Sequence, residues 1–351
     1  MNFCSDNVTG AAPEILAAIT AANSGAVTSY GADKLTERVE QRLKDIFETD
    51  LAAFPVATGT AANALSLSLL APSWGAVYCH QDAHIAVDEC AAPEFYTGGA
   101  KVVDLPGEHG RLTAAQLADV IARSGKGVVH QAQAAAISLT QATEAGTVYR
   151  PDDVAAIAEV ARKNGLGLHM DGARFANALV FLGVSPAEIT WRAGVDILSF
   201  GATKNGALAA EVVVIFDRKR AEEFAFRRKR AGHLFSKMRF LSAQLDAYLD
   251  NGLWLRTARH ANAMAKRLAD GLMNVPGARL AHPVEANEIF VDLPEHAIRG
   301  LNTDGFQFYR WLGDDKTLLR LVTAHDTKEA DVTAFIASAK RHAARANERV
   351  A

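Results

Sequence analysis

The chain has 351 residues, of which 49% are hydrophobic and 22% are charged, and its formal net charge is -3. A chain of this length and composition can bury a sizeable core and is expected to form two domains. The charge balance leaves no basic stripe for nucleic acid, and no run approaches the roughly 20 apolar residues that cross a bilayer, so neither nucleic acid nor a membrane is an expected partner.

The N-terminus and the cysteines indicate the compartment. The first residues lack the charged-then-apolar layout of a signal peptide, and Cys4, Cys79 and Cys90 include no C-x-x-C pair. We therefore predict a cytoplasmic protein with free thiols, without a disulfide framework and without structural zinc.

The first part of the chain alternates between helical and strand-like patterns. Apolar residues recur at helical spacing in five segments, at residues 13–23, 34–47, 60–70, 113–122 and 152–164. Short apolar runs typical of strands lie at residues 77–80, 101–105, within 128–140, and at 166–170, 196–200 and 211–216. This alternation predicts an α/β fold with a mostly parallel sheet that helices cover on both faces.

The pattern changes near residue 218. Three long helices are predicted in near succession at residues 219–230, 234–250 and 253–273. Strands at residues 288–293 and 317–322 follow, with helical patterns between and after them. We therefore expect a large domain at residues 1–250 and a smaller α+β domain at residues 251–351.

Three segments place polar residues directly after strand-like runs or at the start of a helix. One delivers Asp171 and, three residues later, Arg174; another runs into Lys204, which glycines flank on both sides; the third is the small-residue turn at Gly59 and Thr60. In open parallel sheets, ligands bind beyond the carboxyl ends of the strands. These residues are therefore candidates for a binding site.

Each segment also has a plain structural interpretation. A lone loop lysine is usually a solvated surface charge, and a Thr-Gly-Thr turn is usually a helix cap. The pair His169 and Asp171 lacks an apparent third metal ligand, so no metal site is expected.

One cofactor would use all three segments. Pyridoxal phosphate (PLP) needs a lysine for its Schiff base, a carboxylate for its ring nitrogen and a helix N-terminus for its phosphate. Lys204, Asp171 and the turn at Gly59 and Thr60 supply these groups. A phosphate- or nucleotide-binding protein without covalent chemistry is the alternative that the turn alone would favour.

The sequence resembles the L-threonine aldolases, of the low-specificity type, from about residue 3 to beyond residue 325. These are PLP-dependent enzymes of the aspartate-aminotransferase-like fold, fold type I. The landmarks are Ser5-Asp6-Asn7, Tyr30-Gly31, Gly59-Thr60-Ala61-Ala62-Asn63, Ala83-His84-Ile85 with Asp88-Glu89, His169-Met170-Asp171-Gly172-Ala173-Arg174, Thr203-Lys204-Asn205-Gly206, Lys237-Met238-Arg239 and Arg320-Leu321-Val322-Thr323.

The resemblance implies roles for individual residues. Lys204 would carry the cofactor, Asp171 would pair with its ring nitrogen, and His84 would stack on the ring, with proton transfer as an equally weighted role. Phosphate-binding residues would be Gly59, Thr60 and, from a neighbouring subunit, Arg239. Substrate-binding residues would be Ser5, Arg174 and Arg320, with Tyr30 from the neighbour, so a homodimer or homotetramer with shared active sites is expected.

The resemblance implies a lyase that cleaves threonine, allo-threonine and related β-hydroxy-α-amino acids to glycine and an aldehyde. An aminotransferase or a β-eliminating lyase of the same fold type would share Lys204 and Asp171 and stays an alternative. The chain also departs from common bacterial members, which have a second active-site histidine in an E-N-T-H run. Here that run reads Thr140-Gln141-Ala142-Thr143-Glu144, and the lysine segment reads T-K-N-G rather than S-K-G-L-G.

Overall fold

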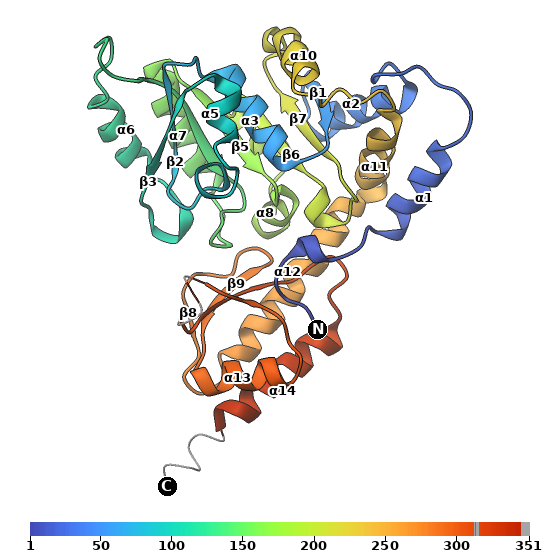
Figure 1. The fold of residues 1–351 in the computed structure, drawn as a ribbon, viewed down its shortest axis with the longest axis vertical. Helices are drawn as coiled ribbons and strands as arrows, with labels where there is room; N and C mark the ends of the chain where they lie inside the picture. Colours follow the sequence, from blue (N-terminus) through green and yellow to red (C-terminus); the bar gives the residue numbers. More distant parts are fainter. Residues whose placement is uncertain (312, 314–315, 345–351) are drawn as a thin grey trace.

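The computed structural model describes residues 1–311, 313 and 316–344. Its larger part is built on a seven-stranded sheet in the order β1-β7-β6-β5-β4-β2-β3 (Figure 1). The strands are β1 (Ala52–Val56), β2 (Gly75–His80), β3 (Lys101–Leu105), β4 (Gln133–Thr140), β5 (Gly167–Gly172), β6 (Ile197–Gly201) and β7 (Glu211–Ile215). Only β7 runs against its neighbours, which confirms the predicted mostly parallel sheet.

Helices cover both faces of this sheet, as expected. They are α1 (Pro13–Ala22), α2 (Lys34–Phe47), α3 (Gly59–Leu70), α4 (His84–Val87), α5 (Ala92–Thr97), α6 (Ala114–Ala122), α7 (Pro151–Asn164), α8 (Phe175–Leu182), α9 (Pro186–Ile189), α10 (Ala221–Arg230) and α11 (Arg239–Leu249). Side chains alternate across a strand. On β7, Val212 and Val214 accordingly pack in a cluster with α2 and α11, while Val213 and Ile215 pack in another with α3 and α10.

The C-terminal part has a four-stranded antiparallel sheet in the order β10-β11-β9-β8. Its elements are α12 (Leu253–Leu272), β8 (Arg279–Leu280), β9 (Glu288–Asp292), α13 (Glu295–Thr303), β10 (Tyr309–Arg310), β11 (Leu318–Val322) and α14 (Glu329–Ala344). Its apolar cluster is separate from that of the large sheet and gathers side chains from these elements. A smaller α+β unit is therefore present, as the sequence predicts.

Two segments join the parts. Helix α12 contributes Leu253 and Trp254 to the core of the large sheet and, further along, Leu268 and Leu272 to the C-terminal core. The N-terminus returns to the C-terminal part, where Phe3 packs in its core (Figure 1). The division of the chain after residue 250 stays a prediction, and residues 345–351 of the expected small domain lie outside the described residues.

The sequence patterns missed several elements. Strand β1 contains Pro55, which has no N–H to donate, and it pairs with β7 alone at the edge of the sheet. Helix α8 is short and mostly buried, so its apolar run shows no helical period. Within the described residues, no helix combines the length and the apolarity needed to span a membrane.

Candidate active site

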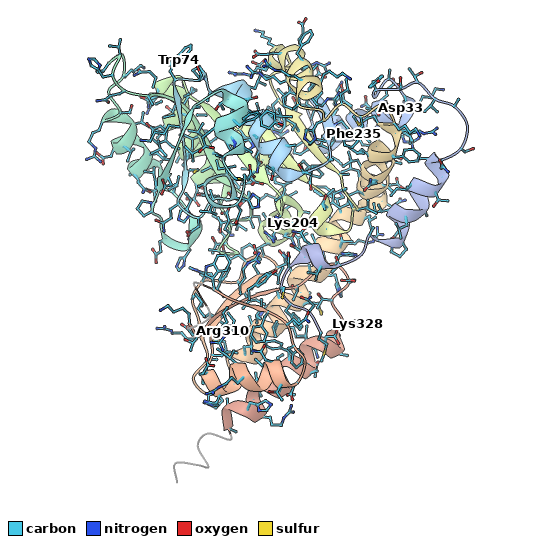
Figure 2. All side chains as sticks on the ribbon, in the orientation of Figure 1. Asp33, Trp74, Lys204, Phe235, Arg310 and Lys328 are labelled. Atoms are coloured by element: carbon cyan, nitrogen blue, oxygen red, sulfur yellow. The ribbon has the colours of Figure 1, made fainter. Side chains whose placement is uncertain are left out.

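Lys204 lies in a tight turn just beyond the end of β6. The turn is held by Asn205, whose Nδ2 donates to Tyr248 Oη at 2.7 Å and to Trp254 O at 2.8 Å. Glu211 Oε2 accepts from the Ala202 N–H at 2.9 Å. Figure 2 shows Lys204 between the large sheet and the C-terminal part, near the middle of the molecule.

Asp171 lies at the end of β5, the strand beside β6. Its Oδ2 accepts from Asn63 Nδ2 at 2.8 Å, and its Oδ1 accepts from the Ala173 N–H at 2.9 Å. The two strand ends approach closely, because a Cβ on Gly201 would lie 2.5 Å from Ala173 O. Only glycine fits there, which explains one of the glycines that flank the lysine.

His84 is held by two glutamates. Its Nδ1 lies 2.8 Å from Glu89 Oε1, and its backbone N–H donates to Glu144 Oε1 at 2.9 Å. Asn63 Nδ2 donates to the same Glu89 oxygen at 2.9 Å. Asn63 thus joins Glu89 to Asp171, and a continuous chain of hydrogen bonds runs from His84 to Asp171.

Burial and the neighbouring charges shift the acid–base properties of these groups. Burial raises the pKa of Glu89, although hydrogen bonds from His84 and Asn63 oppose this. The hydrogen bond to Glu89 raises the pKa of His84 above its ordinary value. Burial, with the charge of Asp171, raises the pKa of Glu144 to about 7. Glu144 is therefore a group of the site that can exchange a proton near neutral pH.

The N-terminus of α3 faces open space. Thr58 caps this helix by accepting from the Ala61 N–H at 3.1 Å. Apart from Gly59 itself, its chain neighbours and the backbone of its own helix, no atom of the described residues lies within 4 Å of the position that a Cβ on Gly59 would occupy. The free N–H groups of the first turn can therefore bind a phosphate.

The three predicted features fit PLP. An amine, a buried carboxylate and the N-terminus of a helix are present, and Asn63 ties the helix to the carboxylate. The contacts of Asp171 come from an amide and a backbone N–H, so neither adds a positive charge that would compete with a protonated ring nitrogen. Lys204, Asp171, Gly59 and Thr60 are the residues that would hold the cofactor.

The residues expected to bind the substrate carboxylate lie together in a charged cluster. Arg174 Nε and Nη2 donate to both oxygens of Asp6 at 2.8 and 2.9 Å, and its Nη1 lies 3.2 Å from Glu288 Oε2. Arg320 donates to Glu288 Oε1 at 2.5 Å and to Cys4 O at 3.3 Å. Ser5, in the same N-terminal segment, accepts from the Asn7 N–H. The sequence did not predict that both guanidinium groups already have carboxylate partners.

Tyr30 and Arg239 lie apart from these residues. Tyr30 is 49% exposed, and Lys229 Nζ lies 4.7 Å from its ring centroid. Arg239 donates to Gly25 O at 3.0 Å. Among the described residues, neither side chain hydrogen-bonds or pairs with Lys204, Asp171 or His84. Their expected contribution to a neighbour's site stays a prediction.

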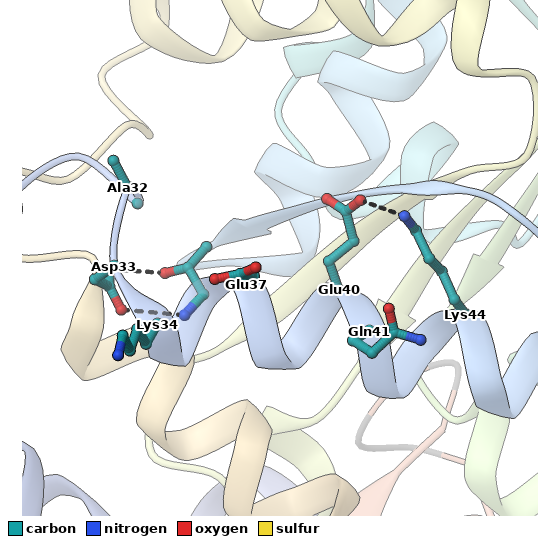
Figure 3. Close-up of a pocket in the computed structure, with 9 residues that line it drawn as sticks. Ala32, Asp33, Lys34, Glu37, Glu40, Gln41 and Lys44 are labelled. Carbon is teal, nitrogen blue, oxygen red and sulfur yellow. Dashed lines mark hydrogen bonds and ion pairs between the residues drawn. The ribbon is translucent and has the colours of Figure 1, made fainter.

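A hollow of about 520 Å³ lies along the exposed side of α2, with Gly31 and Ala32 at one end of its lining (Figure 3). Its polar lining has local structural roles. Asp33 caps α2 by accepting from the Leu35 and Thr36 N–H groups, and Glu40 pairs with Lys44 at 3.0 Å. These contacts stabilise a helix and leave no chemistry to assign there.

Other polar residues of the motifs have structural roles. His169 is fully buried between Ser138 Oγ and Ser199 Oγ, at 2.9 and 3.0 Å, and burial lowers its pKa to about 4. Thr143, within the run that stands where common members have E-N-T-H, is buried and hydrogen-bonds to Thr147 at 2.9 Å. No group of three or more metal ligands is found in the described part of the chain.

Sequence reasoning gave no role to Asn63, Glu89 or Glu288. Asn63 and Glu89 did appear among the landmarks of the resemblance. One signal could have identified Asn63 and Glu89. Each is a polar side chain at a position expected to be buried beside a candidate residue, and a buried polar side chain needs a hydrogen-bond partner. Glu288 left no such signal, since it begins an ordinary strand.

The fold and this site define a PLP-dependent enzyme of fold type I. The family model described as beta-eliminating lyase matches residues 2–296. The chain is 45% identical to a low specificity L-threonine aldolase of a Pseudomonas species over 330 residues, 94% of each chain, and 46% identical to that of Pseudomonas aeruginosa over 89% of this chain and 90% of the relative.

Comparison with solved structures points to the same family. A threonine aldolase structure from Leishmania major superimposes with a TM-score of 0.91 at 28% identity, covering 97% of this chain and 99% of the other. A serine palmitoyltransferase with PLP shares the fold, with a TM-score of 0.70 at 20% identity over 99% and 87% of the two chains. The chain belongs to the beta-eliminating lyase family and, within it, to the threonine aldolases; it is a lyase.

Proposed function

We propose that this enzyme uses PLP at Lys204 to cleave threonine, allo-threonine and related β-hydroxy-α-amino acids to glycine and an aldehyde. The observation that carries the proposal is the convergence of Lys204, Asp171 and the N-terminus of α3 at neighbouring strand ends. The names of the relatives at 45% and 46% identity support the choice of substrate.

Bound PLP supplies an acceptor for the electron pair that is released when the Cα–Cβ bond of the substrate breaks. Asp171 stabilises the proton on the ring nitrogen, which that acceptor role requires. Lys204 carries the cofactor, and the N–H groups at Gly59 and Thr60 bind its phosphate together with Arg239 from a second copy of the chain. Each of these roles uses a group that the fold already holds in place.

The substrate carboxylate binds to Arg174 and Arg320, with the hydroxyl group of Ser5. A guanidinium group has five donors, and Asp6 accepts from two nitrogen atoms of Arg174. Donors therefore remain for a substrate. The carboxylates that pair with the two arginines reduce the positive charge that attracts the substrate. This favours selective binding over tight binding.

The deciding experiment compares wild type with Lys204→Ala in a threonine cleavage assay, with the visible spectrum recorded alongside. Lys266→Ala is the control, since Lys266 lies on the surface of α12 and pairs with Asp270. We expect Lys204→Ala to abolish both threonine cleavage and the visible absorbance of the bound cofactor. The control should keep both. A Lys204→Ala protein that kept its colour and its activity would refute the proposal.

Product analysis separates the alternatives. An aminotransferase would form a keto acid and a β-eliminating lyase would release ammonia, whereas the proposed reaction releases glycine and acetaldehyde from threonine. A phosphate-binding protein without covalent chemistry would be colourless and insensitive to borohydride. A cytoplasmic location belongs to the same proposal, and the three unpaired cysteines support it.

A further inference from the structure

A buried carboxylate determines which ring nitrogen of His84 carries a hydrogen. Glu89 Oε1 lies 2.8 Å from His84 Nδ1; the Glu89 side chain is 0% exposed, while that of His84 is 37% exposed. An ionised carboxylate only accepts hydrogen bonds, so Nδ1 must be the donor. His84 Nε2, the other nitrogen, forms no hydrogen bond to any described residue. It is therefore the atom that is free to meet a substrate.

Asn63 fixes the position of Glu89. Its Nδ2 donates to Glu89 Oε1 at 2.9 Å and to Asp171 Oδ2 at 2.8 Å, which uses both hydrogens of one amide nitrogen. A flipped amide would place its oxygen against both carboxylates, so only one orientation is stable. Asn63 lies on α3, which is buried and packs against several strands of the large sheet. The position of His84 is thereby tied to the rigid part of the fold.

Four charged residues contact His84 or act on it through space. Glu89 contacts the ring, Glu144 contacts the backbone N–H, and Asp171 and Lys204 act on it through space. The hydrogen bond to Glu89 is the largest influence that raises the pKa of His84; burial and Lys204 oppose it, and Asp171 adds to it. Glu89 is therefore the residue whose change should alter His84 most.

We propose that Glu89 and Asn63 are positioning residues that hold His84 with its hydrogen on Nδ1, so that Nε2 accepts the proton of the substrate β-hydroxyl group. In this step the O–H bond breaks and its electron pair forms the carbonyl group of the aldehyde. As the Cα–Cβ bond breaks, PLP held by Lys204 and Asp171 would supply the acceptor for its electron pair, and the proton stays on Nε2 until solvent removes it. This inference rests on the proposed function and assigns its base.

The first test needs no substrate and no cofactor. In the apoprotein labelled with ¹⁵N-histidine, two-bond correlations of the ring distinguish the two tautomers, and His84→Asn identifies the His84 signals. We expect wild-type His84 to carry its hydrogen on Nδ1 when neutral. In Glu89→Gln, the amide can donate as well as accept, so both tautomers should appear and the pKa of His84 should fall. Wild-type His84 with its hydrogen on Nε2 would overturn the inference without any variant.

The second test follows turnover of the PLP-loaded enzyme against pH. Loss of the Glu89 charge should lower kcat ~100-fold, the scale of general-base catalysis, while KM changes much less. The rise of kcat/KM with pH should move to lower pH, because its position follows the pKa of the base. Glu94→Gln is the matched control; this glutamate lies on α5, and among the described residues its side chain makes no hydrogen bond to His84, Asn63 or Asp171.

The outcomes separate this inference from the proposed function. If wild type does not cleave threonine, both fail. If wild type cleaves threonine and Glu89→Gln matches it in kcat, pH profile and His84 tautomer, only the role of Glu89 is refuted. A loss of kcat with an unmoved pH profile and an unchanged tautomer also refutes it, since that result describes a residue needed only for packing.

Discussion

The imidazole groups of His169 and His84 belong to the same part of the molecule, but their pKa values move in opposite directions. His169 has two serine hydroxyl groups as partners and is fully buried, so burial decides and the pKa falls to about 4. His84 has a carboxylate partner, so its pKa rises. The charge of the partner therefore decides which histidine is suited to proton transfer.

The pKa of His169 has a consequence for stability. A histidine that is ordinary in the unfolded chain titrates near 6.5 and here titrates near 4 when folded. Between these pH values the unfolded state binds the extra proton, so the free energy of unfolding falls as the pH falls from 6.5 towards 4, by up to ~3 kcal/mol. Above pH 6.5 this contribution is complete.

Urea unfolding at a series of pH values measures this effect. His169→Gln removes the pH-dependent contribution of His169 to the free energy of unfolding. The stability difference between wild type and variant should therefore shrink as the pH falls from 6.5 towards 4. Parallel curves for the two proteins would contradict the assignment.

The sequence placed the candidate residues that follow a strand, but it could not place their hydrogen-bond partners. Lys204 and Asp171 could be identified because the carboxyl ends of parallel strands meet at one edge of a sheet. Asn63 could not be connected to Asp171, which is 108 positions away, because that contact depends on how α3 packs on the sheet. At Arg174 the sequence named a substrate-binding group but gave no sign that Asp6 pairs with it within the chain.

At the scale of elements, four charged side chains link the N-terminal segment, the start of α8 and the strands β9 and β11. Two guanidinium groups, of Arg174 and Arg320, meet two carboxylates, of Asp6 and Glu288. The charges of Arg174 and Lys204 hold the pKa of Asp6 below its ordinary value, although burial opposes this. The two guanidinium groups and two carboxylates give the cluster no net formal charge.

Glu288→Gln should change substrate binding and stability in opposite ways. Removal of one carboxylate leaves the cluster more positive, so the KM for threonine should fall several-fold, on the scale of about 1 kcal/mol for one charged contact. The free energy of unfolding should fall by ~3 kcal/mol, because both guanidinium groups lose a buried charged partner.

The measurements are KM at fixed pH and the urea midpoint. Glu285→Gln is the control; this nearby glutamate pairs with Arg150 at 2.9 Å rather than with either guanidinium group of the cluster. An unchanged KM in Glu288→Gln would mean that the substrate carboxylate binds elsewhere.

At the scale of the whole molecule, the candidate site lies where the large sheet meets the C-terminal part, and the chain alone does not place every expected residue there. Tyr30 and Arg239 lie apart from Lys204 on the same chain. If a second copy supplies them, a mixed dimer of two inactive chains contains one complete site.

Mixing therefore tests the shared site. Lys204→Ala and Arg239→Ala, each nearly inactive alone, should recover up to about a quarter of wild-type activity after they are unfolded and refolded together, as random pairing and one intact site per mixed dimer require. Two samples refolded separately and then combined are the control. No recovery in the mixed sample would show that Arg239 acts within its own chain or not at all.

The N-terminal segment has a consequence for synthesis. Phe3 packs against Phe306 and Phe335, and its backbone N–H donates to Gln307 O at 2.8 Å, all residues that the ribosome adds late. Domains fold as they emerge, so the large sheet and Arg174 can form while the first residues still lack their docking surface. Asp6 then reaches Arg174 only after the residues that dock Phe3, up to Phe335, have been added. A nascent chain would keep this arginine without Asp6 until the C-terminal sheet and α14 have formed, so the candidate site would be completed after the large sheet.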